Sequence, residues 1–194
     1  QIRRHARVRR RARSRHERRR RPQNLGVEVR GRDRRARQPA GPRALGARSI
    51  LASPLVVGQR DRINHAKGRE VYRPLSLAVT KAFHTKAFRG SACPYMLHSA
   101  AVREGWGPVL NEGLHVDQHS RLQLVDEQSA ARFLDLLQAF DHAAGVPALI
   151  YTSLNTDGEP IVGMPSEAVG LLARGVIDRL FIGGLEVMTK GART

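Results

Sequence analysis

Short apolar segments alternate with turn residues along the chain from residue 41 onward. Where apolar residues alternate with polar ones, or form a short run between turn residues, the pattern predicts a β-strand. The strands predicted in this way cover residues 49–52, 75–79, 95–102, 114–125, 148–151, 177–182 and 185–187. The sequence contains no internal repeat.

The clearest helix is predicted for residues 127–142. Apolar side chains recur three and four residues apart on one face, which is typical of a helix packed against a core. They are Ala130, Phe133, Leu134, Leu137 and Phe140. Asp126 is placed to cap the first turn, and Gly145 can end the helix in a left-handed conformation. Pro147 then prevents the helix from continuing.

Two shorter helices are also predicted. Residues 58–68 form a polar helical segment that ends at Gly68. Residues 165–174 form a helix that opens with Pro165 and ends before Gly175. Strands that alternate with helices indicate an α/β layer domain.

The first 40 residues differ from the rest and are predicted to be a disordered, basic leader. Of the net charge of +17, residues 1–37 contribute 17 arginines and three acids, a net of +14, whereas the remaining residues carry +3. The leader has no apolar periodicity, so it cannot bury enough surface to offset the entropy of ordering. Three interpretations stay open. The leader could be an arm that binds nucleic-acid phosphates or an inert tail. It could also be the product of GC-rich DNA translated in a shifted frame, because residues 1–40 contain arginine but no lysine.

The overall composition bounds the class of protein. Apolar residues make up 41% of the sequence, which suits a globular domain, and no apolar run could span a bilayer or act as a signal peptide. Cys93 is the only cysteine, which excludes an internal disulfide and a cysteine-based zinc site. His5 and His16 lack accompanying carboxylates, so no metal ligands are predicted. We expect a cytoplasmic protein.

Basic residues gather beside turns and strand ends in four segments, 41–50, 67–74, 115–121 and 152–160. Arginine's planar group can bind two phosphate oxygens at once, while lysine acts as a compact point charge. Residues 152–160 also present hydroxyl, amide and backbone N–H groups after a buried strand, as nucleotide loops do. Each signal is weak by itself, because an isolated arginine is more often a surface charge.

Taken together, these segments occur in an order that resembles a known family. The sequence reads GPRALGARSIL at 41–51, Arg60-Asp61 with Asn64, Lys67 with REVYRP at 69–74, CPYM at 93–96, His115 to Arg121, and YTSLNTDGEPIV at 151–162. The set is similar to the O-carbamoyltransferases that act in nodulation, cephalosporin and aminoglycoside biosynthesis. The resemblance covers residues 41–190, about three quarters of the chain, and leaves 191–194 as a tail.

The resemblance implies a fold and a reaction. The family's carboxyl-terminal domain is similar to threonylcarbamoyl-adenylate synthases (YrdC-like domains), in which a twisted mixed sheet with flanking helices surrounds a basic cavity. There, carbamoyl phosphate loses phosphate, and the resulting carbamate attacks the α-phosphorus of ATP, accompanied by Mg²⁺, to give carbamoyl adenylate. A preceding domain with an iron site then transfers the carbamoyl group to a hydroxyl of a small-molecule acceptor. We expect that domain to lie outside this sequence.

The resemblance also implies individual site residues. The candidate carbamoyl-phosphate ligands are Arg43, Lys67, Arg73 and Arg121, of which Lys67 and Arg73 are the candidate catalytic residues. The candidate nucleotide ligands are Thr152, Ser153 and Asn155. Structural alternatives stay open for two further pairs: Arg43 and Arg48 could be buried partners of acids, and His115 and Asp117 could be a hydrogen-bonded pair at a strand end.

Several positions depart from the family pattern. Asp157 stands where the family usually has a basic residue, and a carboxylate facing phosphate is expected to repel it. Tyr151 replaces an asparagine. Met164 replaces a threonine that would cap the helix beginning at Pro165, a loss of about 1 kcal/mol. Two alternative functions therefore stay open: an inactive fragment of the family, or a nucleic-acid-binding protein that acts through its leader.

Overall fold

The computed structural model describes residues 25–26, 46, 48–182 and 184–189. Within these residues the predicted α/β fold, with a mixed sheet and flanking helices, is confirmed. The predicted leader, apart from residues 25–26, lies outside the described residues. So do Arg43 and the predicted tail at 191–194.

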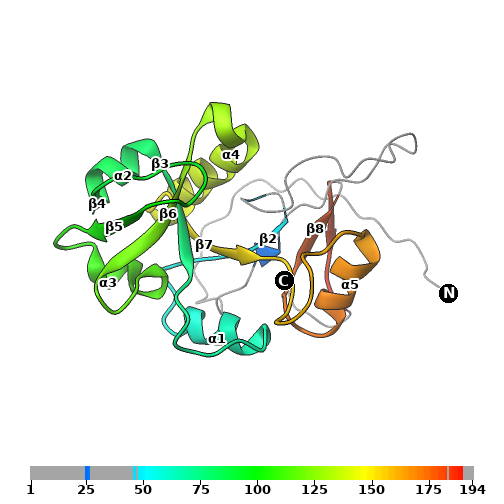
Figure 1. Ribbon diagram of the computed structural model, residues 1–194. Coiled ribbons are helices and arrows are strands. Elements are labelled where there is room, and N and C mark those ends of the chain that lie inside the picture. Colours follow the sequence, from blue (N-terminus) through cyan, green and yellow to red (C-terminus); the bar gives the residue numbers. More distant parts are fainter. Residues whose placement is uncertain (1–24, 27–45, 47, 183, 190–194) are drawn as a thin grey trace, which may run out of the picture.

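Seven strands of the described chain form one sheet in the order β1-β2-β7-β3-β6-β5-β4 (Figure 1). In that order the strands are Leu25–Gly26, Ser49–Ala52, Ala148–Ser153, Ser76–Thr80, His119–Val125, Ser99–Val102 and Phe88–Arg89. β3 and β6 run parallel, and the other neighbours are antiparallel. β1 comes from the segment predicted as the leader and pairs with β2.

Helices cover both faces of this sheet. They are α1 (Gln59–Ala66), α2 (Lys81–Ala87), α3 (Gly107–Leu110), the 3-10 turn η1 (Asn111–Gly113), α4 (Glu127–Ala144) and α5 (Pro165–Ala173). Successive residues of β3 point to opposite faces, as the two-residue repeat of a strand requires. Leu77 packs in one cluster with Ile63 of α1, whereas Ala78 packs in another with Leu137 of α4. α1 and α4 therefore lie on opposite sides of the sheet (Figure 1).

The long helix α4 follows its prediction closely. The Asp126 carboxylate accepts a hydrogen bond from the backbone N–H of Ser129 at 2.7 Å, and the Ser129 hydroxyl accepts one from the Asp126 backbone N–H at 3.2 Å. Gly145 ends the helix with φ 77°, a conformation that favours glycine. The first turn departs from regular geometry at Ala130, whose φ is −164° and ψ is 68°.

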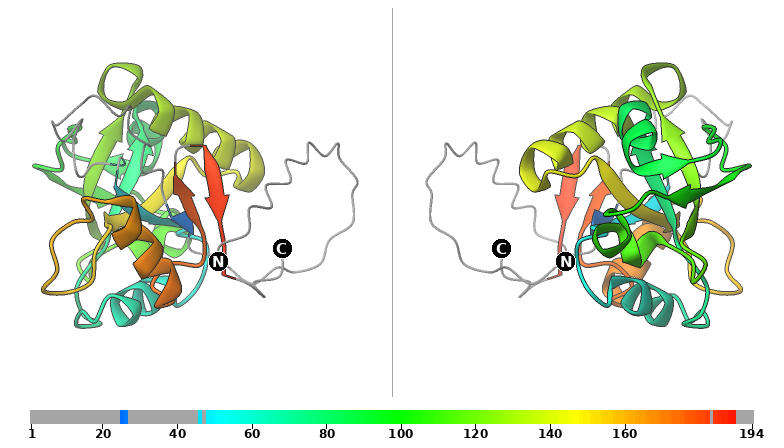
Figure 2. Two further views of the ribbon diagram at one scale, coloured as in Figure 1. Left: turned by 90° about the vertical axis from the view of Figure 1, so that its right-hand side faces the viewer. Right: turned by 90° about the vertical axis from the view of Figure 1, so that its left-hand side faces the viewer.

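α5 and the hairpin of β8 (Leu180–Ile182) and β9 (Leu185–Val187) pack together around another apolar cluster, separate from the two on the faces of β3 (Figure 2). Leu171 of α5 packs with Leu180 and with Leu154, which follows β7. Met164 gives α5 no side-chain hydrogen bond, but the chain just before the helix is held by a residue of its first turn. The Glu167 carboxylate accepts hydrogen bonds from the backbone N–H groups of residues 163 and 164, at 2.7 and 2.9 Å.

Several elements differ from the sequence pattern; the strand predicted for 177–182, for example, covers only Leu180–Ile182. The strand predicted for 95–102 begins only at Ser99, because Met96 adopts a left-handed φ of 59° and turns the chain. The strand predicted for 114–125 begins at His119, after Gln118 with φ 63°. Helix α2 was not predicted, because seven residues are too few to establish a helical period.

Candidate active site

The candidate site lies where three neighbouring strands begin or end. Ser49 at the start of β2 pairs with Ser153 at the end of β7, and Ser76 at the start of β3 pairs with Tyr151. A cavity of about 400 Å³ opens beside these ends. Four cationic residues line it: Lys67, Arg69, Arg73 and Arg121. The volume falls in the range of small-molecule sites.

The cavity brings together all but one of the predicted site residues. Its wall includes Lys67, Arg73, Arg121, Thr152, Ser153 and Asn155, whereas Arg43 lies outside the described residues. These side chains come from the end of α1, the loop after it, β6, β7 and the loop that follows β7. Residues far apart in sequence therefore share one wall, although their roles as ligands stay predictions.

Lys67 is the most buried of the cations, with 2% of its surface exposed. Its ammonium donates hydrogen bonds to the backbone carbonyl of Ser153, to the carbonyl of Asn155 at 2.6 Å, and to Oδ1 of Asn155 at 3.0 Å. An ammonium has three N–H donors. All three are used by the protein, so Lys67 holds the loop after β7 and acts on a bound anion mainly through its charge.

The pKa of Lys67 is lowered to about 7, first by burial and then by the charge of Arg69, while the charge of Asp157 opposes the change. A bound anion stabilises the ammonium form and should raise this pKa. Lys67 is charged below its pKa and loses its charge as the pH rises through it. Anion affinity should therefore decline as the pH increases above about 7.

This coupling predicts proton uptake when an anion binds near neutral pH. Sulfate is a suitable probe because it does not itself titrate there. Calorimetric titrations in two buffers of different ionisation enthalpy should show uptake of up to about half a proton per site at pH 7. Binding without proton uptake would show that Lys67 is already fully charged, or that the anion binds elsewhere.

Arg69 is a cavity cation that sequence reasoning did not select as a ligand. Its Nη1 lies 3.4 Å from Oγ1 of Thr152, a residue of β7. Burial lowers its pKa, and the charge of Arg73 lowers it further. Both effects mean that an anion in the cavity would relieve an unfavourable concentration of positive charge. The position of Arg69, two residues after Lys67, is the feature of the sequence that could have identified it as a cavity residue.

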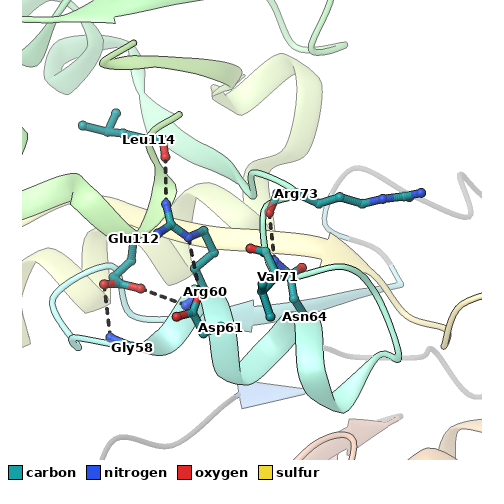
Figure 3. A network of polar contacts seen from close by, with 8 residues as sticks. All are labelled: Gly58, Arg60, Asp61, Asn64, Val71, Arg73, Glu112 and Leu114. Atoms are coloured by element: carbon teal, nitrogen blue, oxygen red, sulfur yellow. Dashed lines mark hydrogen bonds and ion pairs between the residues drawn. The ribbon is translucent and has the colours of Figure 1, made fainter. Parts of the chain in front are cut away.

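The loop that carries Arg69 and Arg73 is fixed by a buried asparagine of α1. Nδ2 of Asn64 donates to the backbone carbonyl of Arg73 at 2.8 Å and to that of Val71 at 3.3 Å. The Arg73 side chain extends away from these bonds (Figure 3). Its Nε lies 2.7 Å from the Glu70 carboxylate, in an exposed ion pair that contributes little to stability. The backbone of Arg73 is therefore fixed by Asn64, while its guanidinium can leave Glu70 and bind another anion.

Glu112 anchors the other end of α1 (Figure 3). Its carboxylate accepts hydrogen bonds from the backbone N–H groups of Gly58 at 3.1 Å and Arg60 at 2.9 Å. The residue before the helix, Gly58, has no side chain to cap it. Glu112, which is 7% exposed, supplies that cap from a distant segment.

Replacing Glu112 by alanine should lower the free energy of unfolding by about 1–3 kcal/mol, because two helix N–H groups lose their acceptor. Urea denaturation measures this loss. Glu112→Gln keeps one acceptor oxygen and should fall between the alanine variant and the wild type. An alanine variant as stable as the wild type would contradict the assigned anchor.

The segment after β7 is tied down by polar contacts. The Ser153 hydroxyl donates to Oδ1 of Asn155 at 2.6 Å, and Nδ2 of Asn155 donates to the Glu159 carbonyl at 2.7 Å. The Glu159 carboxylate accepts from the Thr156 hydroxyl at 2.5 Å and pairs with Arg174 at 2.9 Å. These contacts, first that of Arg174 and then that of Thr156, lower the pKa of Glu159 to about 2. The loop is therefore preorganised.

Arg121 and Tyr151 also line the cavity. Arg121, an exposed residue of β6, makes no ion pair within the described chain. The Tyr151 hydroxyl is buried and has no hydrogen-bond partner among the described residues. Burial raises the pKa of this phenol well above its usual value, while the charge of Arg121 opposes the change. Tyr151 is a wall residue that the sequence pattern marked only as a departure.

His115, Asp117 and Arg48 do not line the cavity. His115 Nδ1 lies 3.3 Å from the Asp117 carboxylate in the turn before β6, so the hydrogen-bonded pair is what the structure shows. Nη1 of Arg48 donates to the Val162 carbonyl at 3.1 Å, which ties the start of β2 to the loop before α5. These contacts are structural.

Comparison with known proteins decides the family. Residues 33–189 match the family model described as Carbamoyltransferase C-terminus. The chain belongs to the carbamoyltransferase C-terminal family. The match begins before Gly41, where the motif resemblance starts.

Curated relatives of this carbamoyltransferase domain include nodulation proteins and an O-carbamoyltransferase. Nodulation protein NolO of Bradyrhizobium diazoefficiens is 36% identical over 161 residues, which cover 80% of this chain and 29% of that protein. The 3'-hydroxymethylcephem-O-carbamoyltransferase of Amycolatopsis lactamdurans is 40% identical over 134 residues, 66% of this chain and 25% of that protein. Nodulation protein U of Azorhizobium caulinodans is 38% identical over 123 residues, which cover 63% of this chain and 22% of that protein.

The carbamoyltransferase domain therefore spans between a fifth and a third of the length of these relatives. In the part of the domain that the structure describes, no helix is long and apolar enough to cross a membrane.

Proposed function

We propose that this domain binds carbamoyl phosphate and ATP side by side in the 400 Å³ cavity and forms carbamoyl adenylate there. The observation that carries the proposal is the convergence of Lys67, Arg69, Arg73 and Arg121 on a hollow that also presents the hydroxyls and amide of residues 152–155. Several fixed cations facing one cavity are costly unless an anion binds there.

The charges suit the two substrates. Carbamoyl phosphate and the triphosphate of ATP repel one another, and this repulsion must be offset for the two to react. Arg73 and Arg121 extend from separate segments and can each contact phosphate oxygens through two N–H groups. The ammonium of Lys67 is fixed by three oxygen acceptors, so its positive charge is preorganised and needs no reorganisation during reaction.

The proposed reaction has two balanced steps. Water cleaves carbamoyl phosphate to carbamate and inorganic phosphate. A carbamate oxygen then attacks the α-phosphorus of ATP, the bond from that phosphorus to the bridging oxygen breaks, and pyrophosphate leaves with the electron pair. Cationic groups near the α-phosphate stabilise the charge that develops on the transferring and leaving groups.

Mg²⁺ accompanies ATP as part of the substrate in this proposal. The described residues contain no group of three or more His, Cys, Asp and Glu side chains that could hold a metal by themselves. Oxygen donors of the cavity wall nevertheless suit a magnesium ion that keeps most of its coordination with phosphates and water. When bound, the ion neutralises negative charge on the phosphates.

The acceptor is proposed to be a hydroxyl of a small molecule, as the name of the cephem O-carbamoyltransferase indicates for that relative. The domain covers a quarter of that protein, so transfer to the acceptor is assigned to a further domain. The proposed product of this domain is the activated carbamoyl donor.

Isotope exchange tests the proposal. The full chain, incubated with ATP, Mg²⁺ and radiolabelled pyrophosphate, should incorporate label into ATP only when carbamoyl phosphate is present. Exchange that needs no carbamoyl phosphate would indicate a different acyl donor. No exchange, together with no ATP binding, would instead support the inactive fragment.

A further inference from the structure

Asp157 places a carboxylate in the wall of the cationic cavity. Its backbone N–H donates to the Lys67 carbonyl at 2.7 Å, which fixes the loop after β7 against the end of α1. Its Cβ lies 4.0 Å from the position that a Cβ on Gly68 would take. Asp157 is close enough to Lys67 and Arg69 for its charge to raise the pKa of both.

This carboxylate conflicts with a site for phosphates alone. It is the only acidic side chain among the described residues that line the cavity, and it is exposed to whatever enters. A carboxylate beside a polyphosphate repels it, and the repulsion grows as water leaves the site. A divalent cation between the two groups reverses the sign of this interaction.

The donors around Asp157 suit one such cation. Mg²⁺ is usually bound by one or two carboxylates together with phosphate oxygens and water. The cavity offers one carboxylate, that of Asp157. The hydroxyls of Thr152 and Thr156 on the same wall already bond to Arg69 at 3.4 Å and to Glu159 at 2.5 Å, so the other ligands of the ion would be phosphate oxygens and water. The surrounding ammonium and guanidinium groups exclude a bare metal ion, so the cation would have to enter with the phosphates that neutralise it.

We propose that Asp157 is the protein ligand of the Mg²⁺ carried by ATP, and that it makes the cavity select magnesium-bound over free nucleotide. This inference rests on the proposed nucleotide site. The expectation that Asp157 weakens nucleotide binding then applies only to metal-free ATP.

The effect of Mg²⁺ on ATP affinity tests this proposal, because Mg²⁺ should strengthen ATP binding in the wild type but not in Asp157→Asn. A purely cationic cavity binds free ATP more tightly than the less negative magnesium complex. With Asp157 present, Mg²⁺ should strengthen binding of ATP to the full wild-type chain by at least about tenfold relative to EDTA. In Asp157→Asn, Mg²⁺ should leave binding unchanged or weaken it. Asp135→Asn, which alters an exposed acid of α4, should behave like the wild type.

Manganese supplies a second readout that does not depend on ATP affinity. Mn²⁺ with a non-hydrolysable ATP analogue should enhance the relaxation of water protons when it binds the wild-type chain. At saturating nucleotide the Mn²⁺ bound to Asp157→Asn should carry one more exchangeable water, and so give a larger enhancement, than the Mn²⁺ bound to the wild type or to Asp135→Asn.

The outcomes separate the two proposals. If Mg²⁺ changes the ATP affinity of the wild type and of Asp157→Asn by the same factor, Asp157 is not the metal ligand, and the nucleotide site is left intact. Failure of both proteins to bind ATP, with or without Mg²⁺, would overturn the nucleotide site itself and this inference with it.

Discussion

Arg73→Ala should lower carbamoyl-phosphate-dependent exchange of pyrophosphate into ATP by about 10²–10³-fold, the cost of removing one donor that stabilises developing charge. The fold should be almost unaffected. The only ion pair of Arg73 in the described chain is with Glu70 at 2.7 Å, and both side chains are about half exposed. Exposed pairs of this kind contribute about 0–1 kcal/mol. Exchange kinetics and urea denaturation of the same preparation measure the two effects separately.

Arg62→Ala is the matched control for Arg73→Ala. Arg62 is also a partly exposed arginine, its Nη2 lies 2.6 Å from the Asp178 carboxylate, and it does not line the cavity. It should keep wild-type exchange. Equal exchange in the two alanine variants would show that charge at the cavity has no special role.

Lys67→Met should abolish exchange to the limit of detection and also destabilise the fold. The carbonyls of Ser153 and Asn155 and the amide oxygen of Asn155 would lose their common donor. Each buried acceptor left unpaired costs about 1–3 kcal/mol, partly offset because methionine removes a buried charge. We expect a net loss of about 1–3 kcal/mol in the free energy of unfolding.

Lys81→Met is the control for this change, since Lys81 is an exposed lysine at the start of α2 outside the cavity. It should preserve both exchange and stability. If Lys67→Met were as stable as the wild type, the ammonium would not organise the loop. If it retained exchange, its charge would be unnecessary.

The sequence was sufficient for elements with a strong local signal. Helix α4 was predictable because its capping residue, its apolar face and its terminal glycine all agree. The strand at 95–102 was overestimated because nothing local shows that Met96 takes a positive φ. That conformation is set by contacts of the 93–97 turn with β6, including the hydrogen bond from the Leu124 N–H to the Cys93 carbonyl at 3.0 Å.

The candidate site was predictable only in part. The motifs identified which cations to examine, and the structure places Lys67, Arg73 and Arg121 on one cavity. The sequence could not show that all three donors of Lys67 are used by the protein, because its acceptors lie 86 and 88 residues away. The same distance in sequence hid the anchor of α1, since Glu112 is 52 residues from Arg60.

Separate cationic segments are proposed to form one site for two phosphorylated molecules. A crystal structure of the full chain with carbamoyl phosphate and a non-hydrolysable ATP analogue would show whether they do. We predict density for both molecules within the one cavity, with their phosphates beside Lys67, Arg73 and Arg121. Density for either molecule outside this cavity, with the three cations facing solvent, would contradict the account.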